Sequence, residues 1–231
     1  TEFPKTVLGK FTIQTSDTGG ATTTLALDRF QRPVLRAEID LLKTNPDGTI
    51  DRTPAIVLVA HLKSKRGMFM TGEDDKDQTI KAIASARSLV ARAAEAAALR
   101  ALVVEETKDT TKPVIVIGDL NDDISSVTTQ MIAGESGFDT ILYSVHDLQE
   151  QQSLRAVNYS HVYNGRYELL DHILVSEELV ARNPKHIAKV RFTRVLNDHL
   201  FDFRLVDRND PRQKTSPTSD HGIPVTEFEW K

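Results

Sequence analysis

The sequence predicts a single α/β domain, on three observations. Residues 114–117 form a continuous run of Val and Ile, which is typical of a strand covered on both faces. Residues 35–41 alternate apolar and charged side chains, as a half-buried strand does. Residues 79–106 carry an apolar stripe at helical spacing, without Gly or Pro. No internal repeat or linker divides the 231 residues, so we expect one domain, residues 1–231, with a sizeable core.

The first elements in chain order are predicted to be short strands and a hairpin. Residues 6–13 could form a short strand, and residues 16–24, rich in Ser, Thr and Gly, a loop. The turn sequence Asn-Pro-Asp-Gly at 45–48 separates two strand patterns, residues 35–41 and 55–62, which therefore predict a hairpin. The apolar face of the first of these strands consists of Leu35, Ala37, Ile39 and Leu41.

The long helix at 79–106 is predicted to act as scaffold. Its many alanines would let it pack closely on a sheet, and a coiled-coil use of the helix is the alternative. Its charged residues lie mostly on the side away from the apolar stripe; they are Arg87, Arg92, Glu95 and Arg100.

The end of the 114–117 strand is the first candidate for chemistry. Pro113 precedes the strand, and Gly118 lets the backbone turn or come close to a ligand. Asp119 and Asn121 lie two residues apart, so in an extended segment their carboxylate and amide leave from one face. The alternative is a loop in which Asp and Asn only make turns or cap a helix.

The C-terminal half adds a helical turn at 126–132, a short apolar segment at 141–143 and a hairpin over 158–176 that turns at Asn164-Gly165. Asp171 lies inside the apolar return strand of that hairpin. A buried carboxylate is costly unless it is paired, so Asp171 should have a partner. Further strands are predicted at 186–195 and 225–230, with a polar loop over 207–219 between them.

Composition limits the possible functions. The net charge of −4 argues against binding nucleic acid by bulk charge, so a polyanion would be held by a local patch or through a metal. The absence of cysteine excludes disulfides, thiolate zinc sites and a cysteine nucleophile. No apolar run is long enough for a membrane span, and no signal peptide is visible in this chain, so we expect a soluble protein and slightly favour the cytoplasm.

Polar residues gather at predicted strand ends: His61, Asp119, Asn121, Asp171, Asp220 and His221. Hard oxygen ligands without cysteine point to Mg²⁺ or Mn²⁺, with Ca²⁺ possible. The basic residues after His61, Lys63, Lys65 and Arg66, could bind phosphate oxygens, the alternative being a solvated basic loop. A metal that neutralises phosphate, together with a carboxylate and a histidine that move protons, predicts phosphoester hydrolysis.

From about Arg32 to the C-terminus, the chain resembles the endonuclease/exonuclease/phosphatase superfamily, which includes deoxyribonuclease I-like nucleases, abasic-site endonucleases, neutral sphingomyelinases and inositol polyphosphate 5-phosphatases. Four motifs in the family's order carry the resemblance: His61-Leu62-Lys63-Ser64, Gly118-Asp119-Leu120-Asn121-Asp122, Leu170-Asp171-His172-Ile173-Leu174-Val175-Ser176 and Ser219-Asp220-His221. The resemblance implies two packed, mainly antiparallel β-sheets flanked by helices, the deoxyribonuclease I-like four-layer sandwich.

The resemblance also implies roles for the site residues. Asp119 would orient or deprotonate the attacking water, and Asn121 would contact the phosphate or a second metal position. His221 would act in the proton relay, oriented by Asp171. His61 would donate to a non-bridging oxygen, and Lys63 and Arg66 would bind substrate phosphate. The metal ligands would be Asp119, Asn121 and Asp220.

One departure from the family pattern stands out. The early Asn and the metal-binding Glu of the family cannot be found; Glu2 and Glu38 are the only glutamates before His61, and neither fits. We therefore expect the C-terminal two thirds of a catalytic domain without its first strands, which an upstream segment of the parent chain could supply. This piece alone should bind metal weakly and could be inactive.

The predicted function is divalent-metal-dependent hydrolysis of phosphodiester bonds, with nucleic acid as the first substrate choice. The first alternative is a lipid or inositol phosphate hydrolase of the same superfamily, and the second is a catalytically incomplete fragment or binding module. Two further clusters are given less weight: Asn197-Asp198-His199 follows a strand as turns do, and His161 is interpreted as a loop residue near the site.

Overall fold

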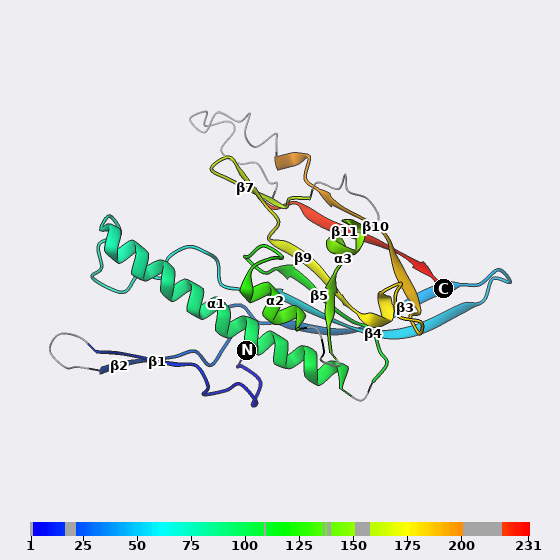
Figure 1. The fold of residues 1–231 in the computed structure, drawn as a ribbon, viewed down its shortest axis with the longest axis horizontal. Helices are drawn as coiled ribbons and strands as arrows, with labels where there is room; N and C mark the ends of the chain where they lie inside the picture. Colours follow the sequence, from blue (N-terminus) through cyan, green and yellow to red (C-terminus); the bar gives the residue numbers. More distant parts are fainter. Residues whose placement is uncertain are drawn as a thin grey trace.

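The computed structural model describes residues 2–16, 22–108, 110–135, 137, 140–150, 158–200 and 219–231. Its central element is a five-stranded sheet in the order β3-β4-β5-β9-β6 (Figure 1). These strands are β3 (Leu35–Thr44), β4 (Ile50–His61), β5 (Val114–Asp119), β6 (Leu142–Ser144) and β9 (Asp171–Ser176). Only the β4–β5 pair is parallel.

The remaining described strands form three antiparallel pairs: β1 (Thr12–Ser16) with β2 (Thr22–Ala26), β7 (His161–Tyr163) with β8 (Arg166–Glu168), and β10 (Ala188–Leu196) with β11 (Ile223–Trp230). The helices are α1 (Gln78–Thr107), α2 (Val127–Ala133), α3 (Val145–Glu150) and a short 3₁₀ helix η1 (Glu177–Leu179). None of the helices in the described ranges has the length and apolar character that a membrane crossing requires.

β5 is covered on both faces, as its Val/Ile run predicts. Val114 and Val116 belong to a core shared with Leu99 and Val103 of α1. Ile115 points the other way, into a second core with Val190 of β10. Figure 1 shows α1 and α2 on one side of the large sheet and the β10–β11 sheet with α3 on the other. The predicted α/β fold of two packed, mainly antiparallel sheets flanked by helices is therefore confirmed.

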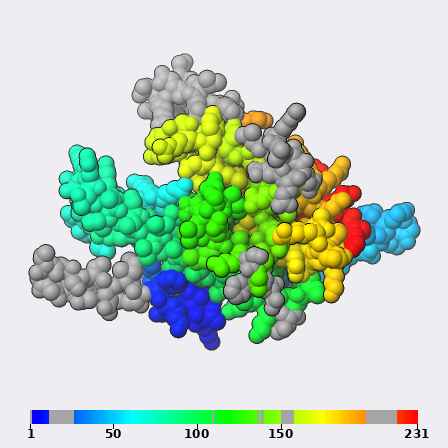
Figure 2. All heavy atoms as spheres, in the orientation of Figure 1, coloured from blue at the N-terminus to red at the C-terminus, as the bar shows by residue number. Residues whose placement is uncertain are grey.

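The hairpin of β3 and β4 is also confirmed, with Leu35 paired to Val59 and Thr44 to Ile50. Its far end projects from the body of the molecule, at the right in Figure 2. The predicted apolar face of β3 is only partly buried, because Leu35 and Ile39 are 61% and 42% exposed. β3 is the outer strand of its sheet, so these two side chains lie beyond the cover that β10 and β11 give to its centre.

Two element predictions need correction. The strand predicted at 6–13 begins only at Thr12, because the preceding residues form turns and Gly9 has a φ of 74°. The single return strand of the 158–176 hairpin is two strands, β8 and β9. The chain bends between them where the hydroxyl of Ser160 accepts hydrogen bonds from the N–H groups of Leu170 and Asp171, both at 3.0 Å. The predicted loop at 16–24 lies partly outside the described residues, and its described residues, 16 and 22–24, belong to strands β1 and β2 and not to a loop. The predicted loop at 207–219 lies mostly outside the described residues.

The end of β5 requires glycine. Gly118 has a φ of 131°, and a Cβ placed there would lie 2.0 Å from the carbonyl oxygen of Ala60 in β4. We expect Gly118→Ala to lower the free energy of unfolding by about 3 kcal/mol or more, measured by urea denaturation. Gly48→Ala is the matched control, because Gly48 also has a positive φ but has open space around it; it should cost only about 1 kcal/mol. Equal costs at the two positions would contradict the steric argument.

A buried histidine beside the central sheet should make the fold sensitive to acid. His146 in α3 is buried, and neither of its ring nitrogens has a hydrogen-bond partner among the described residues. Burial, and then nearby His172, lower the pKa of His146 from 6.5 to about 4. The unfolded chain takes up this proton near pH 6.5 and the folded chain only near pH 4. Stability should therefore be complete above pH 6.5 and fall by about 3 kcal/mol towards pH 4.

This prediction is checked by urea unfolding between pH 7.5 and pH 4. The His146→Leu variant should lose most of the pH dependence, because it has no proton to take up. The residual slope is expected from His172, whose pKa is also lowered by burial. An unchanged slope in the variant would show that His146 is not the group responsible.

Candidate active site

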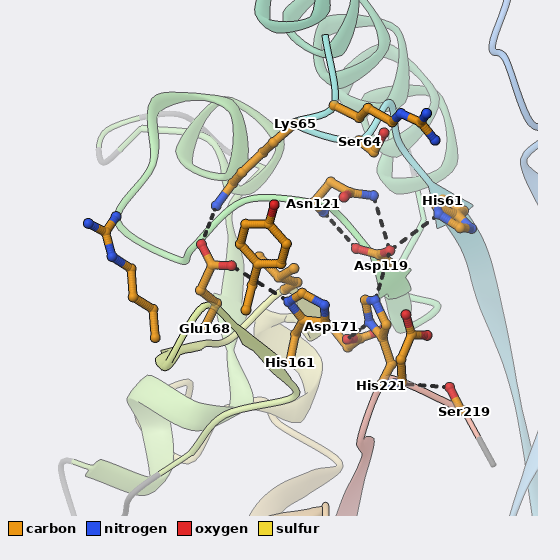
Figure 3. A pocket seen from close by; sticks show the side chains of 15 residues that line it. His61, Ser64, Lys65, Asp119, Asn121, His161, Glu168, Asp171, Ser219 and His221 are labelled. Carbon is orange, nitrogen blue, oxygen red and sulfur yellow. Dashed lines mark hydrogen bonds and ion pairs between the residues drawn. The ribbon is translucent and has the colours of Figure 1, made fainter. Parts of the chain in front are cut away.

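Three neighbouring strands bring their polar residues to one edge of the large sheet. His61 at the end of β4 is in register with Asp119 at the end of β5, and Asp119 is in register with Asp171 at the start of β9. The three residues therefore form a row across the sheet although they are spread over the sequence. His221 joins the row through the hydrogen bond of its side chain to Asp171 (Figure 3). Its backbone forms an isolated bridge with that of His161.

His221 is held in place by Asp171. Its Nδ1 lies 2.7 Å from Asp171 Oδ2, while its Nε2 lies 4.0 Å from Asp119 Oδ2. The hydrogen bond that His221 donates to Asp171 raises the pKa of His221 against the opposing effect of burial. Asp171 thus has the partner that its position in an apolar strand requires, and Nε2 of His221 is turned towards Asp119.

Asp119 is the most crowded carboxylate of the row. Its Oδ1 accepts a hydrogen bond from the N–H of Asn121 at 2.8 Å, and its Oδ2 accepts one from the Asn121 amide at 3.0 Å. His61 Nε2 lies 3.2 Å from the same Oδ2. Burial raises the pKa of Asp119, and the nearby charge of Asp171 raises it further. Burial also lowers the pKa of His61.

The side chain of Asn121 lies beside Asp119, as predicted, but the backbone between them is not the extended segment that the sequence predicts. The φ of Asn121 is 56°, so the segment after β5 is a tight turn and not extended. Its side chain nevertheless lies beside Asp119, because the amide donates both to Asp119 and to the carbonyl oxygen of Leu62, each at 3.0 Å. Asn121 therefore ties the end of β5 to the end of β4.

The basic loop after His61 divides into buried and exposed cations. Lys63 is 8% exposed, and its ammonium donates to the carbonyl oxygens of Ser64 and Arg66 at 3.0 and 2.8 Å. The structure thus places Lys63 inside the loop and not at the pocket, contrary to the phosphate-binding prediction. Lys65 and Arg66 line the pocket. The family resemblance implies phosphate binding by Lys63 and Arg66, whereas the structure has Lys65 and Arg66 at the pocket.

The row of acids and histidines lines a cavity of about 1130 Å³ (Figure 3). Its polar lining includes His61, Asp119, Asn121, Asp171, Asp220 and His221, which the sequence analysis singled out. Possible metal-ligand atoms fall into two groups, each within 4.8 Å: Asp119, Asp171 and His221 form one, and His161, Asp220 and His221 the other. Asp119 and Asp220, predicted to share a metal, thus belong to different groups joined by His221.

The hairpin of β7 and β8 forms a wall of the cavity that the sequence analysis did not assign. His161 lies with its ring centroid 4.8 Å from that of His221, and its Nδ1 lies 3.6 Å from Glu168. Glu168 Oε1 accepts a hydrogen bond from Lys65 at 2.8 Å, which joins the hairpin to the basic loop. His161 was noted as a loop residue near the site, but no local pattern indicated Glu168.

The Asn197-Asp198-His199 cluster lies behind the site. His199 Nε2 is 2.9 Å from the carbonyl oxygen of His221, and the Asn197 amide donates to the carbonyl oxygen of Tyr159 at 2.9 Å. Neither residue lines the cavity. Both contacts are to backbone, so they help to hold the chain segments that carry His161 and His221.

This row of acids and histidines lies at one edge of the larger of the two packed sheets, and the sequence of the chain shows the class of protein to which it belongs. The sequence profile of the endonuclease/exonuclease/phosphatase family matches residues 14–221, and the chain belongs to that family. The family consists of phosphoric ester hydrolases that typically depend on a divalent metal. The search of curated proteins finds no match.

Solved structures are similar to this chain at low sequence identity. An endonuclease/exonuclease/phosphatase family protein from Bacteroides thetaiotaomicron is 16% identical, with 77% of this chain and 48% of that chain covered and a TM-score of 0.41. The human Nocturnin catalytic domain with bound sulfate is 20% identical (86% and 60% covered, TM-score 0.44). A mannosyl-6-phosphatase from B. thetaiotaomicron is 15% identical (95% and 77% covered, TM-score 0.44). The present chain thus spans less than two thirds of the first two proteins.

Proposed function

We propose that this chain forms a single catalytic domain that hydrolyses phosphodiester bonds with a divalent metal, and that its substrate is nucleic acid. The observation that carries the proposal is the arrangement of Asp119, His221 and Asp171. A carboxylate with a raised pKa and a histidine oriented by a second carboxylate face each other across 4.0 Å. This pair has the groups needed to move a proton from an attacking water.

The roles follow from these contacts. Asp119 accepts the proton of the attacking water, for which a raised pKa is favourable. His221 contacts the phosphate through Nε2, because its Nδ1 is engaged by Asp171. His61 and Asn121 contact non-bridging phosphate oxygens from the ends of β4 and β5. Arg66 and Lys65, the latter in place of Lys63, supply positive charge to the substrate.

The acidic side of the site has suitable donors for Mg²⁺ or Mn²⁺. Carboxylate oxygens are the ligands these ions prefer, and the site places two carboxylates close together: burial raises the pKa of Asp119, and the nearby charge of Asp171 raises it further. Asp119, with Asn121 beside it, would hold the ion in the first of the two groups of possible ligand atoms. Asp220 belongs to the second group, which shares His221 with the first. Such an ion stabilises the negative charge that develops on phosphate oxygens during hydrolysis.

The choice of nucleic acid rests on local charge. Lys65, Arg66 and Arg166 line the cavity beside the catalytic row, although the whole chain carries a net charge of −4. A strand with several phosphates would engage these cations while one phosphodiester reaches His221. Tyr163, 62% exposed on the same wall, offers a ring for stacking by a base.

The test is a substrate panel with Mg²⁺ or Mn²⁺: plasmid DNA, RNA, sphingomyelin and inositol phosphates. We expect cleavage of DNA or RNA that stops when EDTA is added. Turnover of only the lipid or the inositol phosphates would replace nucleic acid by the alternative substrate class. If no substrate is cleaved, either by this chain or by a version extended upstream, the binding-module alternative holds.

A further inference from the structure

Helix α1 carries a buried polar stripe directly behind the candidate active site. The stripe consists of Ser88, Arg92 and Glu95, which are 0%, 4% and 2% exposed. Their spacing of four and three residues places them on one face of the helix. The sequence pattern predicts that Arg92 and Glu95 lie on the solvent-exposed side of the helix, away from its apolar stripe. In the structure both side chains are buried.

All three residues of the polar stripe bind the loop that follows β4. Glu95 accepts hydrogen bonds from the N–H of Lys63 at 2.6 Å and from the N–H of Gln31 at 2.8 Å. Arg92 donates to the carbonyl oxygen of Lys63 at 3.2 Å, and Ser88 donates to that of Arg66 at 2.6 Å. The peptide groups on both sides of Lys63 are thus fixed by two residues of one helical turn.

The polar stripe also reaches the loop that follows β5. Arg92 Nε lies 2.6 Å from Asp122 Oδ2, and both side chains are almost completely buried. Asp122 directly follows Asn121, and Lys63 is two residues after His61. One arginine therefore connects the two chain segments that carry His61 and Asn121, at the point where each leaves its strand.

Stability alone is a poor reason for this arrangement. Burial raises the pKa of Glu95, so keeping its charge inside the protein has a cost in folding free energy. A buried ion pair such as Arg92–Asp122 is often no more stabilising than well-packed apolar residues of the same volume. What charged groups add is directional: they fix backbone N–H and C=O groups that belong to a site.

We propose that Arg92 and Glu95 are positioning residues of the active site, which hold the loops after β4 and β5 so that His61 stands beside Asp119. The proposal rests on the proposed function of that site. Loss of either residue lets His61 move relative to Asp119, although both catalytic side chains are still present. Displacement of a reacting group by about 1 Å can lower a rate by about 100-fold.

Two conservative variants test the proposal in the full chain. Glu95→Gln keeps the size of the side chain but leaves one acceptor for two N–H groups. Arg92→Lys keeps the charge next to Asp122 but cannot also reach the carbonyl of Lys63 in the same geometry. Glu105→Gln is the control, because Glu105 lies on the same helix and is exposed. For each variant we would measure the melting temperature, kcat and KM, and the NMR signals of labelled histidines.

We expect kcat of Glu95→Gln and Arg92→Lys to fall about 10- to 100-fold at a temperature where both are folded, with KM nearly unchanged. The imidazole signals of His61 should shift in the metal-free variants, while those of the distant His186 and all properties of Glu105→Gln should stay as in the wild type. Lower melting temperatures with unchanged kcat and His61 signals would overturn the proposal.

The NMR measurement separates this proposal from the proposed function. If the wild-type protein cleaves no phosphodiester but the His61 signals shift in both variants, the positioning role stands and the assigned chemistry fails. If the wild type is active and the His61 signals stay unchanged in the variants, the chemistry stands and the positioning role fails. If Glu95→Gln does not fold, Arg92→Lys decides between these outcomes.

Discussion

His221→Ala is expected to lower the rate of phosphodiester hydrolysis by roughly 10³-fold or more. The imidazole is hydrogen-bonded to the half-buried carboxylate of Asp171 and turned towards Asp119. Without it, Asp171 remains without its partner and the phosphate loses a proton-carrying contact. The measurement is the single-turnover rate on DNA or RNA at saturating Mg²⁺ or Mn²⁺, whichever substrate the panel selects.

The control for this prediction is His186→Ala, because His186 does not line the cavity and its ring is hydrogen-bonded to the backbone carbonyl oxygen of Asn183. That variant should keep the wild-type rate. Thermal unfolding of both variants should show small changes, since His221 is partly exposed and contributes little to either core. A His221→Ala protein with near-normal turnover would remove His221 from the proposed chemistry.

The row of polar residues across the large sheet could be predicted because strand ends determine its position. His61, Asp119 and Asp171 each follow or precede an apolar run, and the pairing of those runs alone brings the three residues into register. The family resemblance then supplied the order of the motifs. Asp171 was also expected to need a partner on energetic grounds, and the hydrogen bond to His221 provides it.

The contacts that support the row could not be predicted in the same way. Periodicity does not identify the buried side of α1: Leu89 and Val90, which belong to its predicted apolar stripe, are 52% and 38% exposed, whereas Glu95 is buried and binds two backbone N–H groups. Lys63 and Lys65 likewise differ only in tertiary context: the clamped backbone directs one ammonium into the loop and leaves the other at the cavity.

The β7–β8 hairpin shows a further limit. Its turn at Asn164-Gly165 was predicted from local sequence, and the hairpin is present. Its place against the active site depends on a contact between Glu168 and Lys65, which are 103 residues apart in sequence. Local patterns carry no information about such a pair, so His161 was expected only near the site and Glu168 was missed.

Asp119→Asn is expected to abolish most of the activity without destabilising the fold. The substitution removes the proposed proton acceptor, which typically contributes about 10²- to 10⁴-fold to a rate. Burial and Asp171 raise the pKa of Asp119, so the folded state favours its neutral form. The contribution of Asp119 to the free energy of unfolding is therefore fully present below pH 3.8, the pKa of Asp119 in the unfolded chain. It is lost as the pH rises through the higher pKa of the folded state. At pH 7 the uncharged Asn avoids that loss but leaves one acceptor oxygen for the two donors of Asn121, so the melting temperature should stay close to that of the wild type.

Metal binding gives this last prediction a second readout. A ligand at ten times its Kd stabilises a folded protein by about 1.4 kcal/mol, so Mg²⁺ or Mn²⁺ should raise the melting temperature of the wild type, at concentrations that reflect weak binding. Asp119→Asn should lose this shift, whereas Asp51→Asn, a change at an exposed aspartate of β4, should keep both the shift and the rate. If Asp119→Asn melts at a lower temperature but its melting temperature still rises with the metal, Asp119 contributes to the stability of the fold and does not bind the ion. Another carboxylate would then bind the ion, and Asp220 is the first to examine.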